Sequence, residues 1–153
     1  MIMFQSCNGQ KNTEQIISRI DNIDFSPLQG ISIYFRSKGH SRNTNIYFLN
    51  EFKGKCSPYS VEVDKSNIDG LIINNDLVLK SCNKDYLSSD EIKTLIKEYV
   101  KLDLCLVQVD NFGNIYINPD KQEAPVLLKL SGKSPPKDLG EFKEYKDNWY
   151  IRK

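Results

Sequence analysis

The sequence predicts an α+β domain with a mostly antiparallel sheet built of hairpins and two amphipathic helices. Segments rich in β-branched and aromatic residues follow one another along the chain with short turns between them, which favours hairpins over parallel βαβ units. A helical spacing of apolar residues is clear in two segments. With 153 residues, of which 39% are hydrophobic, the chain is long enough to bury one core of its own.

The first helix is expected over residues 13–23. Asn12 or Thr13 can serve as the N-cap, because a short polar side chain there accepts hydrogen bonds from the free amides of the first turn. Pro27 ends the helical segment, since a proline disfavours helical geometry at the residue before it, here Ser26. The apolar stripe of this helix consists of Ile16, Ile20 and Ile23.

The second helix, within residues 87–100, is the clearest local pattern in the sequence. Ser88 as N-cap and Glu91 three residues later form a capping box. Leu87 and Ile92 are spaced as a hydrophobic staple. An apolar stripe follows, and a sheet is the simplest cover for it. The stripe consists of Ile92, Leu95, Ile96, Tyr99 and Val100.

Short strands are expected where β-branched and aromatic residues gather between turns. The first two strands flank the polar loop 37–44 and form a hairpin. A further hairpin is expected around Asn74–Asp76, because these residues tolerate left-handed turn geometry. The large side chain of Trp149 is expected in the core or on a sheet face. The expected strands are 31–36, 45–52, 59–63, 71–73, 77–79, 102–109, 115–117, 125–130, 142–145 and 149–152.

Composition and motifs argue against several kinds of function. The net charge of +1 gives the chain no field that would steer it to nucleic acid. The four cysteines lack metal-ligand spacing and His40 is the sole histidine, so neither a metal site nor a cofactor is expected. Hydrolase and phosphate-loop motifs are absent from the sequence, which disfavours an enzyme. Carboxylates brought together by the fold are the alternative, as in an envelope enzyme.

Positive charge concentrates around the first expected hairpin, in Arg36, Lys38, His40 and Arg42. Aromatic residues interleave with these charges, a combination that can bind single-stranded nucleic acid. The same charges can attract an acidic protein partner. The sequence favours a protein or an envelope component over nucleic acid, with the aromatic side chains directed into the core. These aromatic residues are Tyr34, Phe35, Tyr47 and Phe48.

Three of the four cysteines lie in the body of the sequence, and their contexts differ. Cys56 and Cys82 lie in loop-like segments, and they are the pair expected to form a disulfide if the compartment is oxidising. Cys105 lies within an apolar strand segment, where it is expected to pack as a small buried hydrophobe.

A short run near the N-terminus ends in a cysteine. Phe4 lies three residues before Cys7, and the small residue Ser6 lies directly before it. This Phe-Gln-Ser-Cys run, followed by Asn-Gly-Gln, resembles the lipidation site of bacterial lipoproteins of the Bacteroidota type. The resemblance implies that the Cys7 thiol carries a diacylglyceryl group, that the preceding peptide is removed and that the new amine is acylated. More than one acyl chain gives stable membrane anchoring.

The resemblance also sets the expected organisation and location. Residues 1–12 would be a signal remnant and tether, and residues 13–153 a single α+β domain. Six residues precede Cys7, fewer than an export signal needs, so a start upstream of Met1 is expected. The favoured function is then a lipid-anchored, non-catalytic protein-binding module of the envelope, immunity- or inhibitor-like by analogy. If Met1 is the true start, the protein is cytoplasmic and binds nucleic acid or a partner through the basic hairpin.

Overall fold

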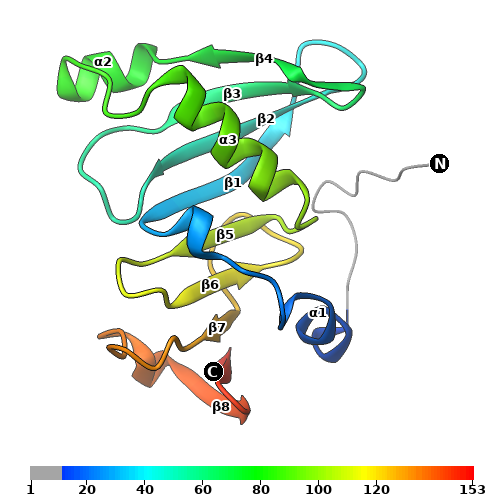
Figure 1. Cartoon of the computed structure of the whole chain (residues 1–153), viewed down its shortest axis with the longest axis vertical. Coiled ribbons are helices and arrows are strands. Elements are labelled where there is room, and N and C mark those ends of the chain that lie inside the picture. Colours follow the sequence, from blue (N-terminus) through cyan, green and yellow to red (C-terminus); the bar gives the residue numbers. More distant parts are fainter. Residues whose placement is uncertain (1–11) are drawn as a thin grey trace.

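The computed structural model of the chain describes residues 12–153. They form a nine-stranded sheet in the order β4-β3-β2-β1-β5-β6-β7-β9-β8 (Figure 1), and every neighbouring pair is antiparallel. The predicted α+β fold with a sheet built of hairpins is thus confirmed. The strands are β1 Ile31–Lys38, β2 Thr44–Glu51, β3 Tyr59–Asp64, β4 Asn67–Asn74, β5 Leu106–Val109, β6 Ile115–Asn118, β7 Leu127–Lys129, β8 Phe142–Lys146 and β9 Trp149–Arg152. The helices are α1 Thr13–Ile20, α2 Asp76–Cys82 and α3 Ser89–Val100, with short 3-10 turns η1 Ser26–Leu28 and η2 Leu139–Glu141.

The main core lies between the helices and one face of the sheet. In Figure 1, α3 crosses the half of the sheet that contains β1 to β4, and α1 lies beside the other half, where its isoleucines share the core with β6, β7 and β9. Ile92 and Ile96 of α3 are buried in the same cluster as Leu49 of β2 and Val61 of β3. Burying such side chains contributes about 1.5–3 kcal/mol each, so this sheet–helix contact is a substantial source of stability.

The predicted caps of the two helices are present. The Asn12 side chain accepts hydrogen bonds from the amides of Glu14 and Gln15, so Asn12 is the N-cap of α1. The Ser88 hydroxyl accepts from the amide of Glu91 at 3.1 Å and caps α3. Each cap satisfies amides that would otherwise have no partner in the helix, which is typically worth about 1 kcal/mol.

The hairpin expected around Asn74–Asp76 is wrong. The structure contains a single strand, β4, that extends to Asn74 and pairs with β3 through a tight turn at Lys65 and Ser66. The segment expected as the next strand, 77–79, belongs to the helix α2. The structure therefore has three helices in residues 12–153 where the sequence predicted two.

Local hydrogen bonding and tertiary contacts explain this helix. The Asn74 side chain accepts a hydrogen bond from the Asp76 amide at 2.9 Å, which favours a helical turn at that point over a hairpin. The helix then buries Val78 in the main core. It also carries Cys82 to Cys56, and a disulfide joins them. Both contacts are long-range, so a short apolar run could not reveal them.

The face of the sheet opposite the helices is covered at one end only. Tyr116 of β6, Leu128 of β7 and Phe142 of β8 form a second, smaller buried cluster there. Leu139 of the η2 turn packs against it. Helices of the described chain lie on the other face, so the strands β1 to β4 present a helix-free surface. We call this surface of β1 to β4 the open face.

The first helix is fastened by the last strand. The indole N–H of Trp149 donates to Asp21 Oδ1 at 2.8 Å, and Lys129 Nζ donates to the Asp21 carbonyl at 2.7 Å. Hydrogen bonds from the Trp149 indole and then from Lys129 lower the pKa of the Asp21 carboxyl below its ordinary value. The residue after α1 is therefore bound to both β9 and β7.

Candidate functional site

An aromatic pair lies on the open face, on strands β1 and β2. Tyr34 of β1 is directly opposite Phe48 of β2, with ring centroids 5.7 Å apart in an edge-to-face arrangement. Both side chains are half-buried. Their neighbours in sequence point to the helix side: Tyr47 is buried in the main core, and Phe35 packs against it. The expectation that all four aromatic residues point into the core thus holds for these two and is wrong for Tyr34 and Phe48, because side chains alternate along a strand.

Arg36 extends this pair with a positive charge. A register shift in β1 between Phe35 and Ser37 places Arg36 in a β-bulge. Its guanidinium carbon lies 5.6 Å from the centroid of the Phe48 ring, a cation–π contact, and the residue is exposed. Bulges commonly redirect one side chain next to functional sites. We call Tyr34, Arg36 and Phe48 the aromatic–arginine patch.

His40 and Glu62 close the loop of the β1–β2 hairpin onto β3. Glu62 accepts hydrogen bonds from the backbone amide of His40, from its Nδ1 at 3.0 Å and from the Thr44 hydroxyl at 2.8 Å. The bond from the His40 side chain, followed by the other two, lowers the pKa of the Glu62 carboxyl from 4.5 to about 2. His40 itself is 86% exposed.

This carboxylate predicts a pH dependence of the hairpin loop. The Glu62 pKa is lower in the folded state, so its stabilising contribution is fully present above the unfolded value of 4.5 and is lost as pH falls through about 2. We expect the free energy of unfolding of Glu62→Gln to fall less than that of the wild type between pH 4.5 and about 2, because glutamine does not titrate. Urea unfolding of both proteins at several pH values measures the difference. Parallel pH curves for the two proteins would contradict the prediction.

The loop end of the same hairpin gathers further positive charge. Lys38 ends β1, Arg42 is exposed in the loop, and Lys65 lies in the neighbouring β3–β4 turn. Desolvation, followed by the nearby charge of Lys38, lowers the pKa of Lys65. The structure thus places Arg36, Lys38, His40 and Arg42 along one hairpin. We call Lys38, Arg42 and Lys65 the basic end.

The hydrogen bonds of His40 hold the β1–β2 loop against Glu62 of β3. A hydrolytic triad needs a hydroxyl or thiol hydrogen-bonded to the imidazole. Here the Thr44 hydroxyl contacts Glu62 and the Ser41 hydroxyl contacts Thr44. Within residues 12–153, no group of three or more His, Cys, Asp or Glu side chains is arranged to hold a metal ion.

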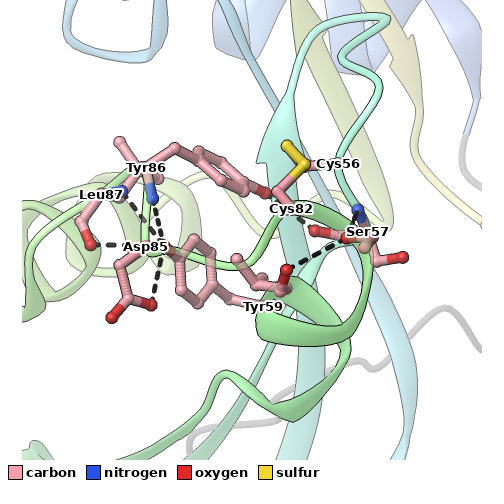
Figure 2. The surroundings of a disulfide bond; sticks show 9 residues. Cys56, Ser57, Tyr59, Cys82, Asp85, Tyr86 and Leu87 are labelled. Carbon is pink, nitrogen blue, oxygen red and sulfur yellow. Dashed lines mark hydrogen bonds between the residues drawn. A yellow bond between two sulfur atoms is a disulfide. The ribbon is translucent and has the colours of Figure 1, made fainter.

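The Cys56–Cys82 disulfide is part of a larger network that fixes α2 to the sheet (Figure 2). The Tyr59 hydroxyl accepts hydrogen bonds from the amides of Tyr86 and Leu87, at 2.9 and 3.1 Å. The Tyr86 hydroxyl in turn donates to the Ser57 carbonyl at 3.0 Å. The sequence had marked these two cysteines as the pair to form a disulfide, whereas nothing local marked the tyrosines that support it.

A cleft of about 380 Å³ is another feature that sequence analysis missed. Phe52 stacks on Tyr116 with ring centroids 5.7 Å apart. Phe112, in the β5–β6 turn, is more than half exposed at the cleft. The Pro135-Pro136 pair indicates an extended segment, but an extended segment alone does not predict a cleft. The cleft is lined by Phe52, Lys53, Asp110, Asn111, Phe112, Tyr116, Ser134, Pro135, Pro136 and Lys137.

Comparisons with protein-family profiles, with curated proteins and with solved structures found no match to this chain. The helices in residues 12–153 are too short or too polar to cross a membrane. Cys7, the expected lipid attachment site, lies outside the described residues.

Proposed function

We propose that this chain is a non-catalytic protein-binding module of the bacterial envelope, held at a membrane by lipid on Cys7. The partner binds the open face through the aromatic–arginine patch, Tyr34, Arg36 and Phe48. The observation that carries this proposal is the position of the patch on a sheet face without a covering helix. The basic end, Lys38, Arg42 and Lys65, contributes charge beside it.

The composition of the patch supports a protein partner. Aromatic residues and arginine are enriched at the centres of protein interfaces, where a few such residues contribute most of the binding energy. The charges of the basic end would increase the association rate with an acidic partner. An immunity-like or inhibitor-like role fits a domain of this size that blocks another protein by covering its surface.

The disulfide supports a location outside the cytoplasm. Cys56 and Cys82 are bonded to each other, and structural disulfides form and persist mainly in oxidising compartments such as the periplasm. This agrees with the lipoprotein-like run at Cys7, which implies export.

Substitutions on the open face test the binding proposal. A photo-crosslinking residue placed at position 34 in cells identifies the partner, and binding is then measured with both purified proteins. We expect Arg36→Glu combined with Phe48→Ala to weaken this binding by about 30-fold or more, the effect of losing an interface hot spot. Lys143→Glu, on the exposed β8 strand, is the control and should bind as the wild type does. Equal affinity of the double variant would refute the proposed surface.

The lipid anchor has its own test. Mass spectrometry of protein produced from its natural gene in its own host should show a diacylglyceryl group on Cys7 and loss of the preceding residues. A Cys7 that is unmodified, or bonded to another cysteine, with residues 1–6 retained would contradict the anchor. It would leave the open-face proposal untouched.

One observation favours a second candidate, binding of single-stranded nucleic acid. Tyr34 and Phe48 with Arg36 combine aromatic faces and a cation on an open sheet. In this case a labelled oligonucleotide binds with a steep dependence on salt concentration, and Arg36→Glu reduces the affinity. Absence of binding at low salt would remove this candidate.

A further inference from the structure

The two edges of the sheet differ in their protection against pairing with another strand. β8 forms one edge, and its exposed Lys143, Glu144 and Lys146 discourage such pairing. β4 forms the other edge; a register shift interrupts its pairing with β3 between Asn67 and Ile72, but residues 71–74 are regular and have no charge or proline. Within residues 12–153, β4 pairs with β3 alone. One side of its backbone therefore has no strand neighbour in the described chain.

Exposed apolar side chains gather at this edge. Ile72, in the middle of the uncharged stretch, is 64% exposed. Leu77 and Leu79 of α2, directly after β4, are 45% and 40% exposed. Figure 1 shows β4 at the rim of the sheet with α2 at its end. Single exposed apolar residues are normal on a protein surface, but three beside an unpaired strand edge indicate an interaction site.

We infer that β4 pairs with β4 of a second copy of this chain, so that the two sheets join across a two-fold axis. Pairing of an edge strand supplies main-chain hydrogen bonds, and the side chains determine the partner and register. A two-fold axis requires the same strand from both copies in antiparallel order. The sequence of β4 can therefore be tested against itself.

One register fits both faces. If Ile72 faces Ile72 of the second copy, then Leu71 faces Ile73 of that copy. Ile72 lies opposite Glu62 on the open face, whereas Leu71 and Ile73 pack against the main core, so each pair joins apolar residues on the same face. A shift that centres the axis on Leu71 would place Ile73 against Asp69. A shift that centres it on Ile73 would place Ile72 against Asn74.

The charges near this edge are compatible with the same register. In this register residues 70–74 of the two copies pair with each other, and Asp69, the charged residue of β4, lies outside that stretch, so no like charges are opposite each other there. Asp69 forms an ion pair with Lys97 of α3 in its own chain.

Sedimentation or light scattering over a range of concentrations tests the inference. The wild type is expected to have twice the chain mass of 17.7 kDa. Ile72→Lys places two like charges opposite each other and should shift dimerisation to at least about tenfold higher concentration. Tyr145→Lys, on the other edge strand, is the control and should remain dimeric. Because Ile72 is exposed, the Ile72→Lys variant should fold normally, and its circular dichroism spectrum should match that of the wild type. A monomeric wild type, or a fully dimeric Ile72→Lys variant, would overturn the inference.

Cysteine cross-linking tests the register separately. In the proposed register the two cysteines of an Ile72→Cys dimer lie directly opposite each other. Their Cα atoms would be about 4.5–5.5 Å apart, which is within disulfide range. Asn74→Cys is on the same strand and face, yet its two copies are separated by about 14 Å. We expect oxidation to produce a covalent dimer with Ile72→Cys and none with Asn74→Cys. The reverse result would exclude this register.

Discussion

Replacing Trp149 with alanine is expected to lower the free energy of unfolding by about 3–5 kcal/mol, the usual cost of truncating a buried large aromatic residue. Trp149 is 1% exposed, packs in the main core and donates its indole N–H to Asp21. A domain of this kind has about 5–15 kcal/mol of stability in total, so the loss is a large fraction. Urea unfolding followed by circular dichroism measures it, since the substitution removes the sole tryptophan.

A phenylalanine at the same position separates burial from hydrogen bonding. Trp149→Phe keeps much of the apolar volume and loses only the indole N–H, so we expect a smaller cost of about 1–2 kcal/mol. Asp21 is partly exposed and water can replace the lost donor. An alanine variant within about 1 kcal/mol of the wild type would contradict the burial of this side chain, since such small effects are typical of surface positions.

The second large effect is expected from the disulfide. Replacing Cys56 and Cys82 with serine should cost about 3–4 kcal/mol, because a cross-link over 26 residues restricts the unfolded chain. The unfolding free energy from urea denaturation measures this cost. The folded structure should persist, because the Tyr59 hydroxyl and Tyr86 still join the same segments.

Ser81→Ala is the matched control for the disulfide variant. The Ser81 hydroxyl accepts a hydrogen bond from the Ser57 amide at 2.9 Å beside the disulfide. Its removal disturbs the same loop and leaves the covalent bond in place, so we expect a cost of about 1 kcal/mol. If the double serine variant costs no more than Ser81→Ala, the disulfide does not restrain the unfolded chain as proposed.

The sequence was informative where structure depends on neighbouring residues. The cap at Ser88 and the apolar stripe of α3 involve residues within a few positions of one another, and both were predicted correctly. The α2 segment was mistaken for a strand, because its burial depends on β3 and its end on Cys56. Three apolar residues in a row contain no information about such distant contacts.

The candidate site also has some features that depend on single residues and others that depend on distant contacts. The sequence identified the charges of Arg36 and its neighbours, since charge is a property of each residue. It could not assign Tyr34 and Phe48 to the open face, because a shift of one residue in register reverses every side chain of a strand. The bulge that directs Arg36 over Phe48 is likewise a product of strand pairing.

The link from Asp21 to Trp149 and Lys129 bears on the order in which the chain can fold. Asp21 follows α1 directly, whereas Lys129 and Trp149 lie 108 and 128 residues further along the chain. During synthesis α1 therefore emerges from the ribosome well before its partners in β7 and β9. Its hydrogen bonds to these strands can form only after more than a hundred further residues have been added.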